Sequence, residues 1–426
     1  MRKALVTGGK RLSGTVSISG SKNAALPILA ASILLHGETT ITNVPNLLDV
    51  ISMIRILRAL GLRAEYFEPN TVKIYTDNSI RHVAPYELVT KMRASFFIIG
   101  PILARMGLAK VPLPGGCAIG SRPVNLHIKG LEALGAHVGM EHGFVIVKAN
   151  KLKGAKIYLD LPSVGATETI MMAATYSEGE TMIENAAQEP EIADLAAFLN
   201  RCGARIEGAG GETIKITGVG KLKGAEYKVM PDRIEASTLM VAGAITKGDI
   251  TLNGVIEQHV EPVIRKLQDA GVDVVVSGGQ VRVKVKDGIK SMDIKTMPYP
   301  GFPTDVQPQF TSFMSIANGT SVVTETVFEN RFMHMHELKR MGADIRIEGQ
   351  SAIIKGVKKL SGCPVRASDL RAGAALVLAG LAADGETLVD DGERFIERGY
   401  DDLIGKLCSL GGDLKEINGI NGSNHQ

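Results

Sequence analysis

The segment LGLRA at residues 60–64 decides the fold, because versions of it recur along the chain. Each version ends a helix-like run with a glycine and leads into alternating residues that favour a β-strand. Successive glycines of this segment are 74, 68, 68, 71 and 69 residues apart, and self-similarity at a fixed period indicates repeated structural units. The sequence therefore predicts six units of about seventy residues. The glycines are Gly61, Gly135, Gly203, Gly271, Gly342 and Gly411.

Each unit has the same expected order of elements, β-α-β-α-β-β. Glycine suits the end of the second helix, because it takes the left-handed conformation freely. Strands that alternate with helices favour an α/β fold in which each unit buries an apolar face against its neighbours. The first unit is expected to have strands at 14–19, 39–44, 63–67 and 72–75 and helices at 23–35 and 48–60.

The composition is that of a globular protein with reduced cysteines. The 426 residues carry a formal net charge of +3, which does not favour general nucleic-acid binding. The four cysteines lie far apart without a Cys-x-x-Cys pair, so neither structural zinc nor a disulfide framework is expected. The N-terminal segment has no apolar run, and the longest apolar stretches, at 26–35 and 96–104, are too short to cross a membrane. We expect a cytoplasmic protein without a membrane partner.

Polar residues recur at the junction between the first strand and the first helix of a unit. Such a helix end offers free N–H groups to an anion, and open α/β sheets bind ligands at these strand ends. Because the chemistry of the junction differs from unit to unit, packing alone does not explain it. The junction residues are Ser21, Lys22 and Asn23; Ser163, Val164 and Gly165; Asp232, Arg233 and Glu235; Thr304 and Asp305; and Asp369 and Arg371.

A set of cations lies at or near these junctions and at glycine turns. Arginine binds carboxylate and phosphate through two parallel hydrogen bonds, so the set indicates a substrate with several negative charges. His127, His334 and His336 could suggest a metal, but no acidic or cysteine ligand stands at a supporting spacing, and no metal is expected. The phosphate-binding and dinucleotide-binding glycine motifs are both missing, so neither nucleotide hydrolysis nor a dinucleotide cofactor is expected. The cations are Lys22, Arg93, Arg122, Arg331, Arg371 and Arg398.

The second unit carries an insertion, LPGGCAIGSRPVNLH at residues 113–127. Glycines on both sides of Cys117 allow sharp turns and a close approach to a ligand. A cation near a thiol favours the thiolate, and Arg122 follows five residues later. A lone cysteine is also often a small buried hydrophobe, so the residues themselves leave both interpretations open.

Eight segments together resemble the UDP-N-acetylglucosamine enolpyruvyltransferases, over about residues 1–415. The resemblance implies a two-domain inside-out α/β barrel with three units per domain and pseudo-threefold symmetry. It places residues 1–21 and 230–426 in one domain, residues 22–229 in the other, and the active site in the cleft between them. The segments are SGSKNAALPILAA, LPGGCAIGSRPVNLH, PSVGATET, PDRIEAST, FPTDVQPQF, TETVFENRFMH, SDLRAGAALVLAG and ERGY.

The resemblance implies a reaction in which enolpyruvyl passes from phosphoenolpyruvate to the 3′-hydroxyl of UDP-N-acetylglucosamine, with release of phosphate, in peptidoglycan precursor synthesis. It implies that Asp305 is the general base and that Cys117 is an acid that also forms a covalent adduct, the residue that fosfomycin would alkylate. Lys22, Arg122 and Arg398 would hold the phosphate, and Arg331 and Arg371 the carboxylate. Further substrate-binding residues would be Asn23, Arg93, Pro123, Val124, Asn125, Leu126, Ser163, Val164, Gly165, Val327 and Asp369.

The chain departs from the family pattern at two positions. Asn125 stands where members often have Asp, and Leu161 stands where some have a lysine. Two other functions stay open at this point. Shikimate-phosphate enolpyruvyltransferases share the fold and the reaction type, although the Cys117 loop favours the UDP-sugar enzyme. Six repeats could also form a scaffold or a nucleic-acid-binding protein, which would need neither the Cys117 loop nor Asp305.

Overall fold

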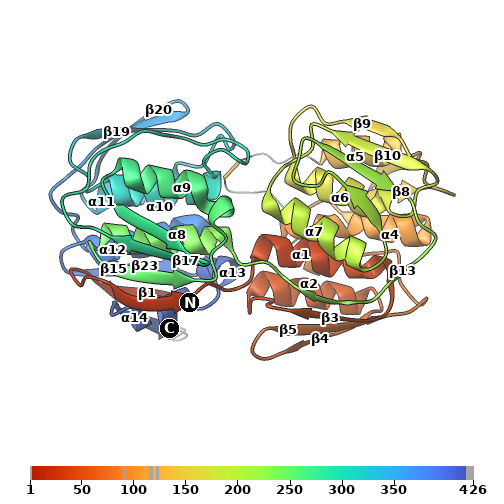
Figure 1. The fold of residues 1–426 in the computed structure, drawn as a ribbon, viewed down its shortest axis with the longest axis horizontal. Coiled ribbons are helices and arrows are strands. Elements are labelled where there is room, and N and C mark those ends of the chain that lie inside the picture. The colour runs from red at the N-terminus through yellow and green to blue at the C-terminus, as the bar shows by residue number, and fades with distance from the viewer. Residues whose placement is uncertain (1, 91, 115–118, 121–123, 419–426) are drawn as a thin grey trace, which may run out of the picture. The chain divides into compact units, whose positions relative to one another are not determined.

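The computed structural model describes residues 2–90, 92–114, 119–120 and 124–418. Within these ranges the chain divides into two compact units, which are described separately (Figure 1). Unit 1 comprises Met1–Ser19, Ala118–Ser121 and Pro231–Gln426, and unit 2 comprises Gly20–Cys117 and Arg122–Met230.

Six sheets form, one for each predicted repeat. In the third repeat, β9 pairs in parallel with β10, β10 pairs antiparallel with β12, and β12 pairs antiparallel with β11. The four strands of a repeat therefore stand in the spatial order first, second, fourth, third. This arrangement confirms the α/β fold and, in the third repeat, the β-α-β-α-β-β order. The second repeat departs from it, because its sheet has three described strands, β6, β8 and β7, and only an isolated bridge at Val83 stands in place of the first strand.

The elements of unit 2 are α1 (Lys22–Ala31), η1 (Ser32–Leu34), β3 (Leu35–Thr42), α2 (Leu48–Ala59), β4 (Arg63–Phe67), β5 (Thr71–Thr76), α3 (Tyr86–Val89), η2 (Arg93–Ile98), α4 (Ile99–Met106), β6 (Leu108–Pro112), α5 (Asn125–Ala133), β7 (His137–Glu141), β8 (Phe144–Lys148), β9 (Lys156–Tyr158), α6 (Val164–Ala174), β10 (Glu180–Glu184), α7 (Pro190–Arg201), β11 (Arg205–Glu207), β12 (Thr213–Thr217), β13 (Leu222–Lys223) and β14 (Glu226–Lys228).

The elements of unit 1 are β1 (Arg2–Thr7), β2 (Ser13–Ser17), α8 (Arg233–Ile245), β15 (Asp249–Asn253), α9 (Glu257–Asp269), β16 (Asp273–Ser277), β17 (Gln280–Lys284), β18 (Ile294–Lys295), η3 (Thr304–Val306), α10 (Gln307–Met314), β19 (Thr320–Thr324), α11 (Met333–Arg340), β20 (Asp344–Glu348), β21 (Ser351–Lys355), β22 (Pro364–Arg366), α12 (Leu370–Ala382), β23 (Glu386–Asp391), α13 (Phe395–Gly399), α14 (Leu403–Ser409) and β24 (Asp413–Asn418).

The strand expected at 14–19 does not join the first repeat, so that part of the prediction is wrong. This strand, β2, pairs in parallel with β15 of the fourth repeat. The first repeat receives β13 and β14 instead, and both pair in parallel with β3. Chain order alone cannot tell which sheet edge a strand joins, because the edges of similar repeats offer equivalent hydrogen-bonding partners.

The strand β1 was not predicted. It lies between β23 and β24, where the other repeats have their own fourth strand. Its alternating pattern buries Ala4 and Val6, and its backbone pairs on both sides. The first strand of the chain therefore completes the sheet of the last repeat.

In unit 1 each repeat has one almost completely buried helix and one helix that buries only part of its residues. In unit 1 the three buried helices, α8, α10 and α12, contact one another, and the sheets lie outside them (Figure 1). All residues of α8 are buried, whereas α9 buries only Val260, Val263, Ile264 and Leu267, at helical spacing. A helix that is apolar all round belongs in a core, and an apolar stripe suffices for a helix that covers a sheet. The junctions that precede the first helices are therefore held by the most buried elements of each unit.

The predicted helix ends are confirmed at the six repeated glycines. Gly61, Gly203 and Gly411 have φ angles of 102°, 104° and 92°, in the left-handed region, and the other three agree. Boundaries in the first repeat differ from the prediction. The helix expected at 23–35 is α1, which ends at Ala31 and continues as the 3₁₀ turn η1, and β3 then begins at Leu35.

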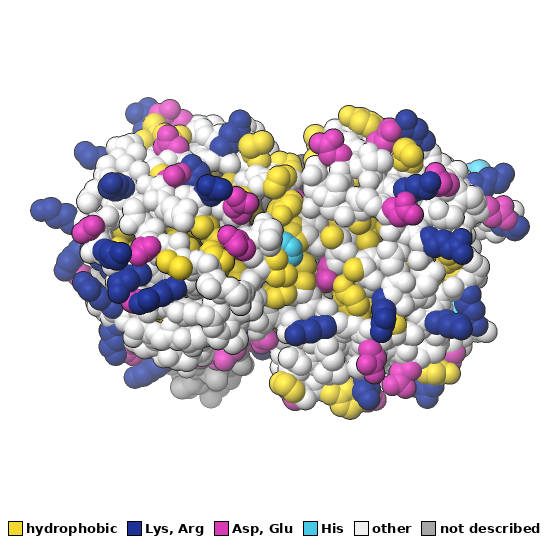
Figure 2. Space-filling model, in the orientation of Figure 1, with side chains coloured by type: hydrophobic (Ala, Val, Ile, Leu, Met, Phe, Trp, Pro, Cys, Tyr) yellow, Lys and Arg dark blue, Asp and Glu magenta, His cyan; other side chains and the backbone are white. Residues whose placement is uncertain are grey.

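Side chains of both charges are interspersed on the face drawn in Figure 2. This distribution agrees with the small net charge of +3. Among the described residues, every helix is too short or too polar to cross a membrane.

Candidate functional site

Four predicted junctions form helix N-caps. Ser21 accepts a hydrogen bond from the backbone N–H of Ala24, and Ser163 accepts one from that of Ala166. Asp232 and Asp369 each accept two backbone N–H groups at the starts of α8 and α12. Such caps satisfy N–H groups that the helix leaves without partners. The prediction that polar residues stand where strands meet helices is confirmed here. The fifth junction differs, because Asp305 lies in the 3₁₀ turn η3 that precedes α10.

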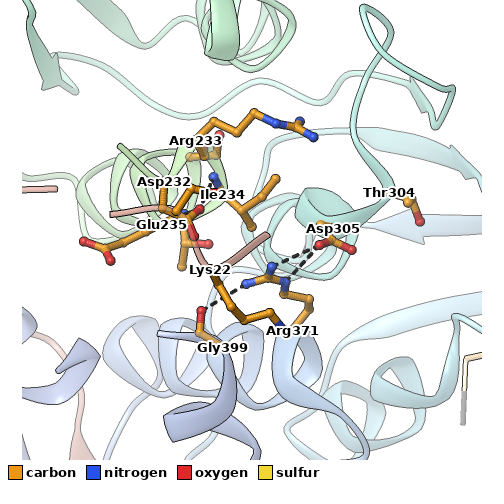
Figure 3. A network of polar contacts seen from close by, with 12 residues as sticks. Lys22, Asp232, Arg233, Ile234, Glu235, Thr304, Asp305, Arg371 and Gly399 are labelled. Atoms are coloured by element: carbon orange, nitrogen blue, oxygen red, sulfur yellow. Dashed lines mark hydrogen bonds and ion pairs between the residues drawn. The ribbon is translucent and has the colours of Figure 1, made fainter. Parts of the chain in front are cut away.

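Asp305 is the centre of a charged cluster in unit 1 (Figure 3). Its Oδ1 accepts a hydrogen bond of 2.7 Å from Nη2 of Arg331. Its Oδ2 accepts hydrogen bonds from Nε and Nη2 of Arg371, at 3.2 and 3.0 Å. The side chain of Asp305 is 26% exposed, so the carboxyl group still reaches the surface of the unit. Two guanidinium groups therefore orient one accessible carboxyl group.

Arg371 is almost completely buried, at 1% exposure. Its Nη1 donates to the carbonyl of Gly399 at 3.4 Å, and its guanidinium lies 5.1 Å from the ring centre of Tyr400. Burial by itself lowers the pKa of Arg371, but Tyr400, Asp305 and Asp232 outweigh it and raise the pKa above its usual range. Arg371 is thus a buried, permanently charged side chain whose Nε and Nη2 point toward Asp305.

Arg331 is held by a chain of hydrogen bonds. Its Nη1 donates to Oγ1 of Thr304 at 2.9 Å, and that hydroxyl donates to Oε2 of Glu325 at 2.8 Å. The guanidinium of Arg331 also lies 5.3 Å from the ring centre of Phe328. Arg331 is 3% exposed, and its direction is therefore set by partners rather than by water.

A buried polar network behind Asp305 was missed by sequence reasoning. Nε2 of Gln309 donates to the carbonyl of Asp305 at 3.1 Å and lies 2.9 Å from both Thr238 Oγ1 and Tyr400 Oη. These residues come from α10, α8 and the end of α13. Two glutamines in QPQF just after Asp305 were the available signal, because glutamine is unusual in a buried helix. The network fixes the turn that carries Asp305.

Unit 2 presents a second set of the predicted residues. Lys22, at the start of α1, forms a buried ion pair of 3.3 Å with Asp49 of α2, and their side chains are 9% and 6% exposed. Nδ1 of His127 lies 3.0 Å from Oγ1 of Thr169. Burial, and then the charge of Arg93, lowers the pKa of His127 to about 3. A Cβ atom at Gly165 would lie 3.1 Å from ring atoms of His127, which explains glycine there.

The remaining predicted residues are placed as follows. Cys117, Arg122 and Pro123 lie outside the described residues. Ile119 is described, and its carbonyl accepts a hydrogen bond of 3.0 Å from the backbone N–H of Asn330, next to Arg331. Among the described residues, no group of His, Cys, Asp and Glu is arranged to hold a metal ion. Arg93 begins η2, Asn23 follows Lys22 in α1, and Val164 begins α6. Val124 is the buried N-cap of α5, which begins with Asn125 and Leu126. Arg398 is half-buried in α13, and Leu161 and Val327 are exposed.

Ser19 is the last residue of unit 1 before the chain passes into unit 2, and it is firmly anchored. The backbone N–H of Ser19 donates to Oε1 of Glu235 at 3.2 Å, and its carbonyl accepts from the N–H of Asp232 at 2.9 Å. Nζ of Lys406 donates to Oγ of Ser19 at 2.6 Å and also to Glu235. Burial raises the pKa of Glu235 to about 7, although Lys406 opposes the shift. Every polar group of Ser19 is therefore held by unit 1.

Comparison with known proteins identifies the class. The family model described as EPSP synthase (3-phosphoshikimate 1-carboxyvinyltransferase) matches residues 6–407. The enolpyruvyl transferase NikO from Streptomyces tendae superimposes with a TM-score of 0.88 at 26% identity, over 98% of this chain and 99% of that chain. An EPSP synthase from Acinetobacter baumannii has a TM-score of 0.77 at 21% identity, over 98% of this chain and 100% of that chain, which shows the shared fold.

Curated relatives narrow the class. One from Geobacter metallireducens is 54% identical over 98% of this chain and 100% of its own length, and is named UDP-N-acetylglucosamine 1-carboxyvinyltransferase. One from Caldanaerobacter subterraneus is 55% identical over 97% of this chain and 99% of its own length, and has the same name with the number 1. The chain belongs to the EPSP synthase family, and within it to the UDP-N-acetylglucosamine 1-carboxyvinyltransferases. The resemblance inferred from the eight sequence segments is confirmed.

Proposed function

We propose that this enzyme transfers enolpyruvyl from phosphoenolpyruvate to the 3′-hydroxyl of UDP-N-acetylglucosamine and releases phosphate, in peptidoglycan precursor synthesis. The observation that carries the proposal is the identity of more than half of the residues, along nearly the whole chain, with relatives named for this activity. The Asp305–Arg331–Arg371 cluster supports it, because it combines an accessible carboxyl group with cations suited to an anionic substrate. Neither a metal nor an organic cofactor takes part.

The reaction proceeds by addition and elimination. A proton added to the methylene carbon of phosphoenolpyruvate leaves positive charge on the central carbon. The sugar oxygen attacks that carbon and loses its proton to a base, which gives a tetrahedral adduct that still carries phosphate. The methyl group then gives up a proton as the carbon–oxygen bond to phosphate breaks, and the enol ether and phosphate are released. The site has to supply an acid, a base and cations.

Asp305 serves as the base on the sugar hydroxyl. In the structure its oxygens are engaged by Arg331 and Arg371, the two residues proposed to bind the carboxylate of phosphoenolpyruvate. The substrate carboxylate competes with Asp305 for the same donors, because both are carboxylates suited to a guanidinium fork. Binding of phosphoenolpyruvate therefore releases Asp305 oxygens, which can then accept the hydroxyl proton.

The other roles follow the same assignment. Cys117 is the acid, and Lys22, Arg122 and Arg398 hold the phosphate. The pair with Asp49 orients Lys22, because the ammonium group is almost completely buried beside that carboxylate. We place residues 1–21 with 230–426 in one domain and residues 22–229 in the other, and the enzyme in the cytoplasm. Asn23 and Asp369 also bind substrate. The residues that contact the nucleotide sugar are Arg93, Arg122, Pro123, Val124, Asn125, Leu126, Ser163, Val164, Gly165, Asp305 and Val327.

Phosphate release tests the proposal directly. The purified enzyme is incubated with phosphoenolpyruvate alone, with UDP-N-acetylglucosamine added, and with shikimate 3-phosphate added instead. We expect stoichiometric phosphate only with the nucleotide sugar, together with an enol ether at its 3′ oxygen by NMR. Release with shikimate 3-phosphate would assign the other acceptor, and no release with either acceptor would contradict the proposed function.

A further inference from the structure

Glu325 is a buried residue that follows β19 and has no place in the assignment above. It is 2% exposed, and four donors converge on its two carboxyl oxygens. Oε2 accepts from Thr304 Oγ1 at 2.8 Å. Oε1 accepts from Thr296 Oγ1 and from the backbone N–H groups of Val327 and Phe328, at 2.8, 2.8 and 3.2 Å. The side chain is therefore an acceptor in every one of these contacts.

The contacts of Glu325 join the segments that carry three residues of the proposed site. Thr304 immediately precedes Asp305, and Val327 is a proposed contact of the nucleotide sugar. Thr304 also accepts from Nη1 of Arg331 at 2.9 Å. The direction of these hydrogen bonds is fixed, because the guanidinium of Arg331 can only donate and the Thr304 hydroxyl donates its single proton to Glu325. Arg331, Thr304 and Glu325 thus form a one-way relay.

The two oxygens of Glu325 serve different parts of the site. Oε2 faces the relay toward Arg331, whereas Oε1 holds the backbone turn at Val327. The backbone N–H of Glu325 itself donates to the carbonyl of Gln350 at 2.9 Å, so the residue is anchored on both sides. A buried acceptor of this kind costs free energy unless its donors are all in place, and it therefore fixes their geometry.

We infer that Glu325 is a positioning residue for the enolpyruvyl transfer, which acts through Thr304 on Arg331 and thereby sets the affinity for phosphoenolpyruvate. Glu325 touches no reacting atom in this scheme. The inference rests on the proposed function, because Arg331 is assigned there to the substrate carboxylate. It predicts that a defect on the Oε2 side weakens phosphoenolpyruvate binding and spares the nucleotide sugar.

The substitution Glu325→Gln separates the two sides. The amide keeps an oxygen for Thr296, Val327 and Phe328 and places an NH₂ group against Thr304. Thr304 Oγ1 then meets donors from both directions, and its own proton has no acceptor. Thr304→Val removes the same relay without touching Oε1. We expect each variant to lower kcat/KM for phosphoenolpyruvate by about tenfold to hundredfold, mainly through KM, with the dissociation constant of UDP-N-acetylglucosamine within about twofold of wild type.

Two further variants complete the test. Thr304→Ser keeps the hydroxyl and should restore kcat/KM to within about threefold of wild type. Thr324→Val is a matched control, since its hydroxyl lies 3.2 Å from Ser351 Oγ and takes no part in the relay, and it should behave as wild type. The double variant Glu325→Gln/Thr304→Val should have a kcat/KM no lower than that of the less active single variant, because both substitutions break the same relay.

The outcomes are distinct. If the wild-type enzyme shows no transfer activity, the proposed function is wrong, whatever the variants show. With an active wild type, unchanged KM for phosphoenolpyruvate in Thr304→Val overturns the inference, and so does equal weakening of both substrates. If Glu325→Gln does not fold, as judged by circular dichroism, the comparison of Thr304→Val with Thr304→Ser decides the matter alone.

Discussion

The carboxyl group of Asp305 and the guanidinium of Arg371 form an ion pair with Oδ2 and Nη2 3.0 Å apart. The two partners differ sharply in exposure, at 26% for the side chain of Asp305 and 1% for that of Arg371. The buried partner is fixed by Gly399 and Tyr400, so its position does not depend on Asp305 alone. Asp305 can therefore release Arg371 and accept a hydrogen bond from another donor, while Arg371 keeps its position.

Asp305→Asn should lower turnover by at least about a hundredfold, because the amide has nearly the same shape but cannot take the proton of the sugar hydroxyl. Binding of UDP-N-acetylglucosamine, measured by calorimetry, should be largely kept. Asp344→Asn, at an exposed position of strand β20, is a suitable control and should be fully active. Turnover of Asp305→Asn equal to wild type would show that another group is the base.

Cys117 should be the single site at which fosfomycin alkylates the enzyme. The phosphonate resembles the substrate phosphate and places an epoxide beside the thiolate. Cys202 is a poor rival, because it is buried and burial raises the pKa of its thiol to about 12. Mass spectrometry in the presence of UDP-N-acetylglucosamine should find one adduct, on the peptide that contains Cys117.

Exchange of this thiol should separate acid catalysis from alkylation. Cys117→Asp still offers a proton but is a poor nucleophile, so it should keep substantial activity and resist the drug. Cys117→Ser is too weak an acid and should lose turnover. An adduct on Cys202, Cys363 or Cys408, or sensitivity that persists in Cys117→Asp, would refute the assignment.

Unit 2 should lose stability in mild acid through His127. The pKa of this residue is about 3 in the fold and near 6.5 in an unfolded chain, so the unfolded state binds more protons between these values. The contribution is complete above pH 6.5 and declines as the pH falls. Between pH 6.5 and pH 5 it should amount to about 2 kcal/mol, measured by urea unfolding. His127→Gln should reduce this dependence, whereas His137→Gln, at an exposed position, should leave it unchanged.

Lys406→Met should destabilise unit 1, because it leaves the buried carboxyl group of Glu235 without its cation, at a cost of about 3 kcal/mol near neutral pH. Glu235 has a raised pKa, so the folded state binds more protons there than the unfolded state, and stability falls as the pH rises. The penalty should therefore be larger at pH 9 than at pH 6 in guanidinium titrations. Glu235→Gln/Lys406→Met should abolish this pH dependence, and a penalty that is the same at both pH values would contradict the explanation.

Much of the fold followed from local patterns. The repeated glycines required left-handed helix ends, and Ser21 and Asp232 had the side chains of N-caps, so both features could be placed without tertiary information. The exchange of β2 and β14 between the first and fourth repeats could not be derived from local patterns, because it depends on long-range pairing of similar edges. The division into two domains came from the family resemblance alone.

The candidate site was predictable to a similar degree. The charged residues Asp305, Arg331 and Arg371 could be proposed because several cations recur at junctions. Glu325 and Gln309 were not singled out, although both lie in segments quoted for the resemblance, since each acts through partners that are distant along the chain. Their importance comes from burial and from the number of donors they face, and neither quantity can be read from a single sequence.

The placement of β1 has a consequence for how the protein is made. Its partners β23 and β24 are synthesised roughly 380 residues after it, which takes about 20 to 80 seconds at common rates of translation. Every strand of unit 2 leaves the ribosome before α9 does, so unit 2 can fold before the partner strands of β1 have been synthesised. During this interval Ala4 and Val6 are exposed on a strand with two unpaired edges, the kind of segment that chaperones shield. Unit 1 therefore completes its last sheet after unit 2 has been synthesised.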